Sequence, residues 1–176
     1  MTVLVLAALA LGGCGSSSPS GPTPAAYVKS ICTSLGSWSS GIRAAGTKLQ
    51  ASAAGTNSIS QGKAQYEAFV GALVTVTARA EQELRAAGVP AVSSGKSISN
   101  ALVNAFSQAG SGLRQAATQA ASIPTANASA YQAAATGVTA SIRQTLAQMA
   151  SVHPEKDPQL HAAAAKEPAC QALKSA

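Results

Sequence analysis

The chain has 176 residues, of which 47% are apolar, 3% aromatic and 10% charged. This length suits one domain with a sizeable core, but so few large side chains exclude a wide interior, so small residues must let helices approach closely. The net charge is +6, yet the 12 Lys and Arg residues are spread without clusters or interleaved aromatic residues, which argues against a nucleic-acid-binding protein.

The N-terminus predicts an export signal followed by a lipid anchor. Residues 3–11 form an apolar run that is too short to cross a membrane, which takes about 20 residues, but suits the core of a signal peptide. Leu11-Gly12-Gly13-Cys14 then has the Leu-small-small-Cys order of a bacterial lipobox, in which the cysteine is acylated and becomes the mature N-terminus. We therefore predict a signal peptide at residues 1–13 and lipid at Cys14. The first two residues carry no Lys or Arg, unlike an ordinary signal peptide, but this departure leaves the Cys14 site intact.

Residues 14–23 follow as a tether rich in Gly, Ser and Pro. The anchor places the protein on the outer face of the cytoplasmic membrane, with the membrane itself as one partner. Cys32 and Cys170 are the two cysteines left over, and an exported chain occupies a compartment that permits disulfides. We expect these two cysteines to pair.

Apolar residues recur every three or four positions in four segments, the pattern of helices with one buried face. Thr23 is expected to cap the first helix and Ser58 the second, because a hydroxyl can accept a hydrogen bond from a free backbone N–H of the first turn. Gly88 is expected to end the second helix in the left-handed conformation. In the connection that follows, Val89 and Val92 are expected to fold back onto the end of the bundle.

The third and fourth helices complete the predicted domain. Pro124 stops the third helix, Thr125 or Asn127 caps the fourth, and Pro154 ends it. Four long helices joined by short connections predict an all-α fold, an antiparallel up-down-up-down four-helix bundle over residues 24–153.

Residues 154–176 predict a short helical tail. Asp157 is placed to cap a first tail helix, and Pro168 starts a final turn that carries Cys170. In the predicted topology the first helix begins and the fourth helix finishes at the same end. A tail that folds back across this end brings Cys170 to Cys32, so we expect the disulfide to tie the tail to the first helix.

The chain resembles the small, alanine-rich secreted lipoproteins of actinobacteria. The resemblance covers most of the chain and rests on short motifs: the lipobox 11–14, Cys32 with Trp38, Ala87-Gly88-Val89-Pro90 with Gly95-Lys96, and Pro168-Ala169-Cys170. It implies a helical bundle and brings no particular activity with it.

No catalytic or cofactor site is expected. The chain lacks a Gly-x-Ser-x-Gly motif and has only two histidines and six acidic residues, so we predict that it is not an enzyme. The densest polar cluster comprises His153, Glu155, Asp157 and His161, residue types that ligate Zn²⁺ or Cu²⁺. Flanking prolines favour a helix stop followed by an aspartate cap, and we therefore predict no metal site there.

Six aromatic residues lie on the apolar faces: Tyr27, Trp38, Tyr66, Phe69, Phe106 and Tyr131. Core packing is the favoured interpretation, and a pocket for an apolar ligand is the alternative. The sequence thus predicts a lipid-anchored extracytoplasmic binding or interaction module, whose partner is an envelope protein or polymer. The alternative function is a carrier of an apolar or lipidic small molecule between the helices. The oligomeric state stays open.

Overall fold

The computed structural model describes residues 20–150 and 156–174, which form helices and contain no strand. The six helices in these ranges are α1 (Pro24–Ala53), α2 (Ile59–Ala86), α3 (Gly95–Ala121), α4 (Ala128–Ala150), α5 (Pro158–Lys166) and α6 (Pro168–Lys174). The expected all-helical class is therefore confirmed for this part of the chain. The predicted signal peptide and Cys14 lie outside the described residues.

The long helices begin where local capping chemistry predicts. The hydroxyls of Thr23 and Ser58 each accept a hydrogen bond from the backbone N–H three residues further on, at 3.3 and 3.2 Å. At the start of α4, the side chain of Asn127 accepts the corresponding bond at 2.8 Å, which decides between Asn127 and Thr125. These bonds satisfy backbone donors that have no partner inside the helix.

The connection between α2 and α3 is only partly as expected. Gly88 has φ of 75°, the left-handed conformation predicted for the end of α2. Val92 is buried at 6% exposure, but Val89 is 40% exposed, so the prediction that both valines pack was wrong for Val89. The backbone N–H of Ala91 donates to the carbonyl of Pro22 at 2.9 Å, and this bond ties the connection to the segment before α1. With the backbone held there, one valine turns inward and the other faces solvent.

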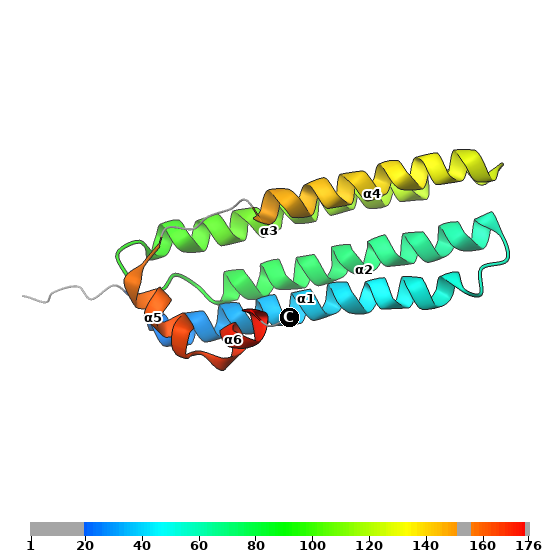
Figure 1. Ribbon diagram of the computed structural model, residues 1–176. Coiled ribbons are helices and arrows are strands. Elements are labelled where there is room, and N and C mark those ends of the chain that lie inside the picture. Colours follow the sequence, from blue (N-terminus) through cyan, green and yellow to red (C-terminus); the bar gives the residue numbers. More distant parts are fainter. Residues whose placement is uncertain (1–19, 151–155, 175–176) are drawn as a thin grey trace, which may run out of the picture.

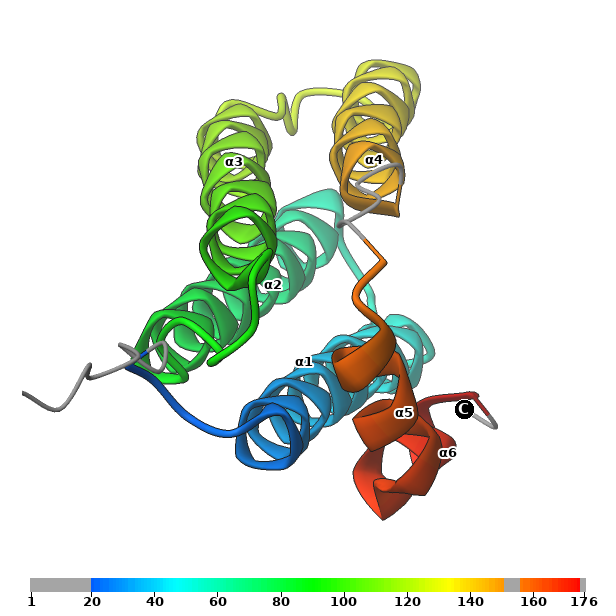
Figure 2. The same cartoon turned by 90° about the vertical axis from the view of Figure 1, so that its left-hand side faces the viewer.

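Four long helices lie alongside one another, with the two short helices against α1 (Figures 1 and 2). Close packing joins α1 to α2, α2 to α3, α3 to α4, and α1 to both α5 and α6, whereas α1 and α4 are not closely packed. Seen end-on, α2 lies between α1 and α3, and α4 lies beside α3 (Figure 2). Close packing thus runs from α1 through α2 and α3 to α4 and does not close from α4 back to α1.

The two ends of the bundle are called the tail end and the far end. The tail end comprises the start of α1, the connection 87–94 and the cap of α5 at Asp157. The far end comprises the connections 54–58 and 122–127. Figure 1 shows the tail end on the left and the far end on the right.

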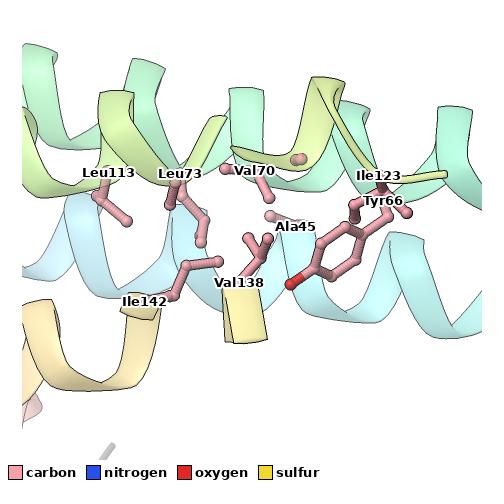
Figure 3. Packing of buried hydrophobic residues seen from close by; sticks show 10 residues of the cluster. Ala45, Tyr66, Val70, Leu73, Leu113, Ile123, Val138 and Ile142 are labelled. Atoms are coloured by element: carbon pink, nitrogen blue, oxygen red, sulfur yellow. The ribbon is translucent and has the colours of Figure 1, made fainter. Parts of the chain in front are cut away.

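The core consists of two clusters along the bundle. The cluster nearer the far end draws on all four long helices, and Val138 and Ile142 of α4 point toward α2 and α3 (Figure 3). The cluster nearer the tail end is built from α1, α2 and α3, with Leu160 of α5 packed against it. Small residues bring the helices close: a Cβ added at Gly112 of α3 would lie 2.6 Å from the Thr145 hydroxyl oxygen of α4.

Candidate functional site

Cys32 and Cys170 form the predicted disulfide. Their Cα atoms lie 5.0 Å apart across a sequence separation of 138 residues. Cys170 is 5% exposed, and it is the only residue of α6 that is buried in the described part of that helix. The bond fixes the tail to α1, two turns after α1 begins.

The tail has little apolar packing of its own, because α5 contains no buried residue. Its start is instead fixed by Asp157, which is 8% exposed. One carboxylate oxygen accepts hydrogen bonds from the backbone N–H groups of Gln159 and Leu160 at 2.9 and 3.2 Å, and the other accepts from the Ser94 hydroxyl at 2.9 Å. Burial raises the pKa of Asp157, but these hydrogen bonds outweigh it and hold the pKa below its ordinary value.

The polar cluster considered for metal binding is only partly described. His153 and Glu155 lie outside the described residues, while Asp157 serves as the expected helix cap and His161 is exposed on α5. Both oxygens of Asp157 are already engaged by donors of the protein. Within residues 20–150 and 156–174, no three or more His, Cys, Asp or Glu residues are grouped as a metal site requires.

An open groove occupies the far end, where the end of α1 and the starts of α2 and α4 meet. Its volume is about 470 Å³, within the usual range for small-molecule sites. The surface is mostly apolar. Its main apolar lining residues are Leu49, Ala53, Ile59, Tyr66, Ala128 and Tyr131. We call this feature the far-end groove.

Three polar side chains of the far-end groove, Thr56, Gln65 and Tyr66, are hydrogen-bonded within the protein. The side-chain oxygen of Gln65 accepts from the Thr56 hydroxyl at 2.6 Å, and its amide nitrogen donates to the Ser52 carbonyl at 3.2 Å. The Tyr66 hydroxyl is bonded to the Thr139 hydroxyl at 2.8 Å. Because these groups already have partners, the groove offers a ligand chiefly apolar contact.

Two further hollows share walls with the far-end groove. One, of about 130 Å³, lies between α1 and α2, shares Leu49 with the groove and has Lys48 at its rim. The other, of about 700 Å³, runs along α4 from the shared Tyr131 to Arg143. The far-end groove therefore continues into flanks that each carry a basic side chain.

Some of the aromatic residues pack in the core and others line a hollow, the two interpretations that the sequence allowed. Tyr27 and Phe106 are each 3% exposed and belong to the core, and Phe106 packs edge-on against Trp38 with ring centroids 5.2 Å apart. Tyr66 and Tyr131 both contact the core and line the groove. The remaining ring, Phe69, lines the smaller hollow beside Leu49.

Sequence reasoning did not single out Lys48, Gln65 or Arg143. Lys48 and Arg143 belong to an evenly spread set of basic residues, and nothing in their spacing marks them. Gln65 looks like an ordinary surface residue of a helix. Only the packing of the helices places Gln65 in the groove, Lys48 in the hollow between α1 and α2, and Arg143 in the hollow along α4.

Comparisons with known protein families, with curated proteins and with solved structures find no match to this chain. Within the residues that the structure describes, no helix has both the length and the hydrophobicity that a membrane span requires. The disulfide, the tail and the far-end groove are the features of this chain that bear on its function.

Proposed function

We propose that this chain is a lipid-anchored, extracytoplasmic binding module that holds an apolar small molecule in the far-end groove. The anchor is Cys14, acylated after cleavage of residues 1–13, and the protein sits on the outer face of the cytoplasmic membrane. The disulfide between Cys32 and Cys170 supports this location, because such bonds persist in oxidising compartments outside the cytoplasm.

The scaffold that we propose is an antiparallel up-down-up-down four-helix bundle. Short connections and close packing of each long helix against the next support this topology. It sets the groove at one end and the tether at the other. Since α1 has 30 residues, the two are separated by about 45 Å at 1.5 Å per residue.

The far-end groove is the observation that carries the binding role. It is concave, mostly apolar and of small-molecule size, and the side chains of Thr56, Gln65 and Tyr66 in it are already hydrogen-bonded within the protein. This combination favours an apolar small molecule over an envelope polymer, which would need donors and acceptors to recognise its sugar or phosphate groups. We propose binding without catalysis, because the polar side chains that line the groove are amides and hydroxyls, with no acidic residue or histidine among them.

Two measurements test the two halves of this proposal. Radiolabelled palmitate should attach to the wild-type protein and not to a Cys14→Ala variant, which should also leave the membrane fraction. Native mass spectrometry of protein purified from its own host should detect a bound mass that is lost in Ala128→Phe, because the large ring fills the groove from the exposed start of α4. Absence of label would refute the anchor, and absence of bound mass in the wild type would refute the carrier role.

A further inference from the structure

The charged residues of α1 and α4, two of the helices around the groove, are all basic. Three basic residues and no acidic residue lie on α1, and α4 carries Arg143 as its single charged residue. Among the described residues, the acidic side chains are confined to α2 and the tail: Glu67, Glu81, Glu83, Asp157 and Glu167. The hollows that flank the groove therefore each contain a basic side chain, Lys48 on α1 and Arg143 on α4.

The basic residues beside the groove also have no acidic partner in the described part of the chain. The ion pairs there join Lys63 to Glu67 at 3.7 Å and Arg85 to Glu81 at 2.7 Å, which leaves Lys48 and Arg143 outside them. No carboxylate in this part of the chain neutralises either side chain. An anion bound near Lys48 or Arg143 would therefore be attracted to an unneutralised positive charge.

Arg143 lies at the end of a continuous track on α4. Tyr131, Ala135, Thr139 and Arg143 are spaced four residues apart, so they share one helix face, and all four line the same hollow. Twelve residues separate Tyr131 from Arg143, which is about 18 Å along the helix. Because side chains of a helix lean toward its N-terminus, the Arg143 side chain covers part of this span, and an extended chain of about ten carbons covers the rest.

We infer that the groove takes a free single-chain anionic amphiphile, whose chain lies in the far-end groove and along α4 while its head pairs with Arg143. This inference rests on the proposed binding role of the same groove. The side chains of Thr56 and Gln65 in the groove are already hydrogen-bonded within the protein, which suits an alkyl chain because it forms no hydrogen bonds. The guanidinium of Arg143 can bind a carboxylate through two parallel hydrogen bonds. Lys48 adds positive charge in the hollow between α1 and α2 that shares Leu49 with the groove.

The occupant is a molecule released from the bilayer and not a lipid still embedded in it. The chain enters α1 at the tail end, so the groove lies about a full helix length from the start of α1. A lipid in the anchoring membrane would have to be withdrawn from it to reach the groove.

The test is calorimetric titration of the full-length chain carrying Cys14→Ala, which removes the acylation site. Decanoate, decanol and decyltrimethylammonium present one chain with a negative, neutral or positive head. We expect decanoate to bind about tenfold more tightly than decanol, the ratio that one charged hydrogen bond supplies, and the cation to bind most weakly.

Matched variants identify the residue that holds the head. Arg143→Gln should weaken decanoate about tenfold and leave decanol unchanged. Arg114→Gln removes the same charge from an exposed site on α3, where Arg114 contacts Ser111, and should change neither affinity. Ala128→Phe should abolish binding of both.

The outcomes separate this inference from the proposed function. Equal affinity for decanoate and decanol, with Ala128→Phe still inactive, would overturn the anionic head and leave the apolar site standing. Unchanged decanoate binding in Arg143→Gln would overturn the role of Arg143. If the protein bound anionic phosphatidylglycerol vesicles but not free decanoate, the claim that the ligand is released from the bilayer would be overturned. If no probe bound, both proposals would be overturned.

Discussion

The tail end and the far end of the bundle are held together in different ways. At the tail end, the Cys32–Cys170 bond, the Ser94 to Asp157 hydrogen bond and the Ala91 to Pro22 backbone bond cross-link segments distant in sequence. At the far end the helices meet through side-chain packing and hydrogen bonds such as Tyr66 to Thr139, without a covalent bond, and a groove remains between α1, α2 and α4. The comparison shows that the covalent bond holds tail helices that bury few residues of their own, while the hollow lies where all four long helices share a core.

The largest expected effect comes from removing the brace at the tail end. A double variant Cys32→Ser with Cys170→Ser frees a loop spanning 138 residues, which in the chain-entropy model costs up to about 5 kcal/mol. Such a loss is a large part of the stability of an ordinary domain. Urea unfolding of the variant and of the wild type under non-reducing conditions measures it. An unchanged unfolding midpoint would show that the bond does not brace the fold.

The next effect tests the far-end core. Leu113 has 0% exposure and lies among residues from all four long helices, so Leu113→Ala should cost about 2–5 kcal/mol through lost contacts and the cavity left behind. Val89→Ala, at a position 40% exposed, is the control and should stay within about 0.5 kcal/mol of the wild type. Similar unfolding midpoints for the two variants would mean that the far-end core is not packed as described.

A smaller effect should follow from pushing α3 and α4 apart. In Gly112→Ala the new methyl group meets the Thr145 side chain at 2.6 Å, and the strain should cost about 1–3 kcal/mol. At Gly137 of α4 an added Cβ meets nothing within 4 Å, so Gly137→Ala should stabilise the helix by about 0.5–1 kcal/mol. Thermal unfolding of both variants compares them directly, and a shift of the same sign in both would contradict close approach at Gly112.

The smallest effect concerns the charge of Asp157 at the tail end. Because hydrogen bonds hold its folded-state pKa below the ordinary value of 3.8, the charged form contributes stability above that value, and this contribution disappears as the pH falls through the folded-state pKa. Asp157→Asn keeps a side-chain oxygen for the cap and removes the charge. At neutral pH the melting temperature of the variant should therefore be lower than that of the wild type. In strong acid the two melting temperatures should be equal. If the difference in melting temperature between the two proteins were the same at all pH values, the charge of Asp157 would be excluded as its cause.

Features set by local chemistry were predictable from the sequence. The caps at Thr23, Ser58 and Asp157 and the left-handed stop at Gly88 depend on a few neighbouring residues, and each was placed correctly. The pairing of Cys32 with Cys170 followed from the expected export signal and the expected fold-back of the tail, and the structure contains this bond.

Features set by how helices lie against each other were not predictable. The groove exists because α4 packs on α3 and not on α1, a choice that depends on close contacts such as Gly112 with Thr145. The roles of Gln65 and Arg143 follow from that separation, so no spacing in the sequence marks them. The same limit explains Val89, since the pinning of the connection to Pro22 brings together segments far apart in sequence.

The central claim is that the far end binds and the tail end anchors. Hydrogen–deuterium exchange of the full-length Cys14→Ala chain, with and without decanoate, tests it most directly. Decanoate should slow amide exchange in residues 49–66 and 128–143 and leave residues 24–32 and 158–174 unchanged. Slowed exchange confined to the tail end, or no change at either end, would contradict the claim.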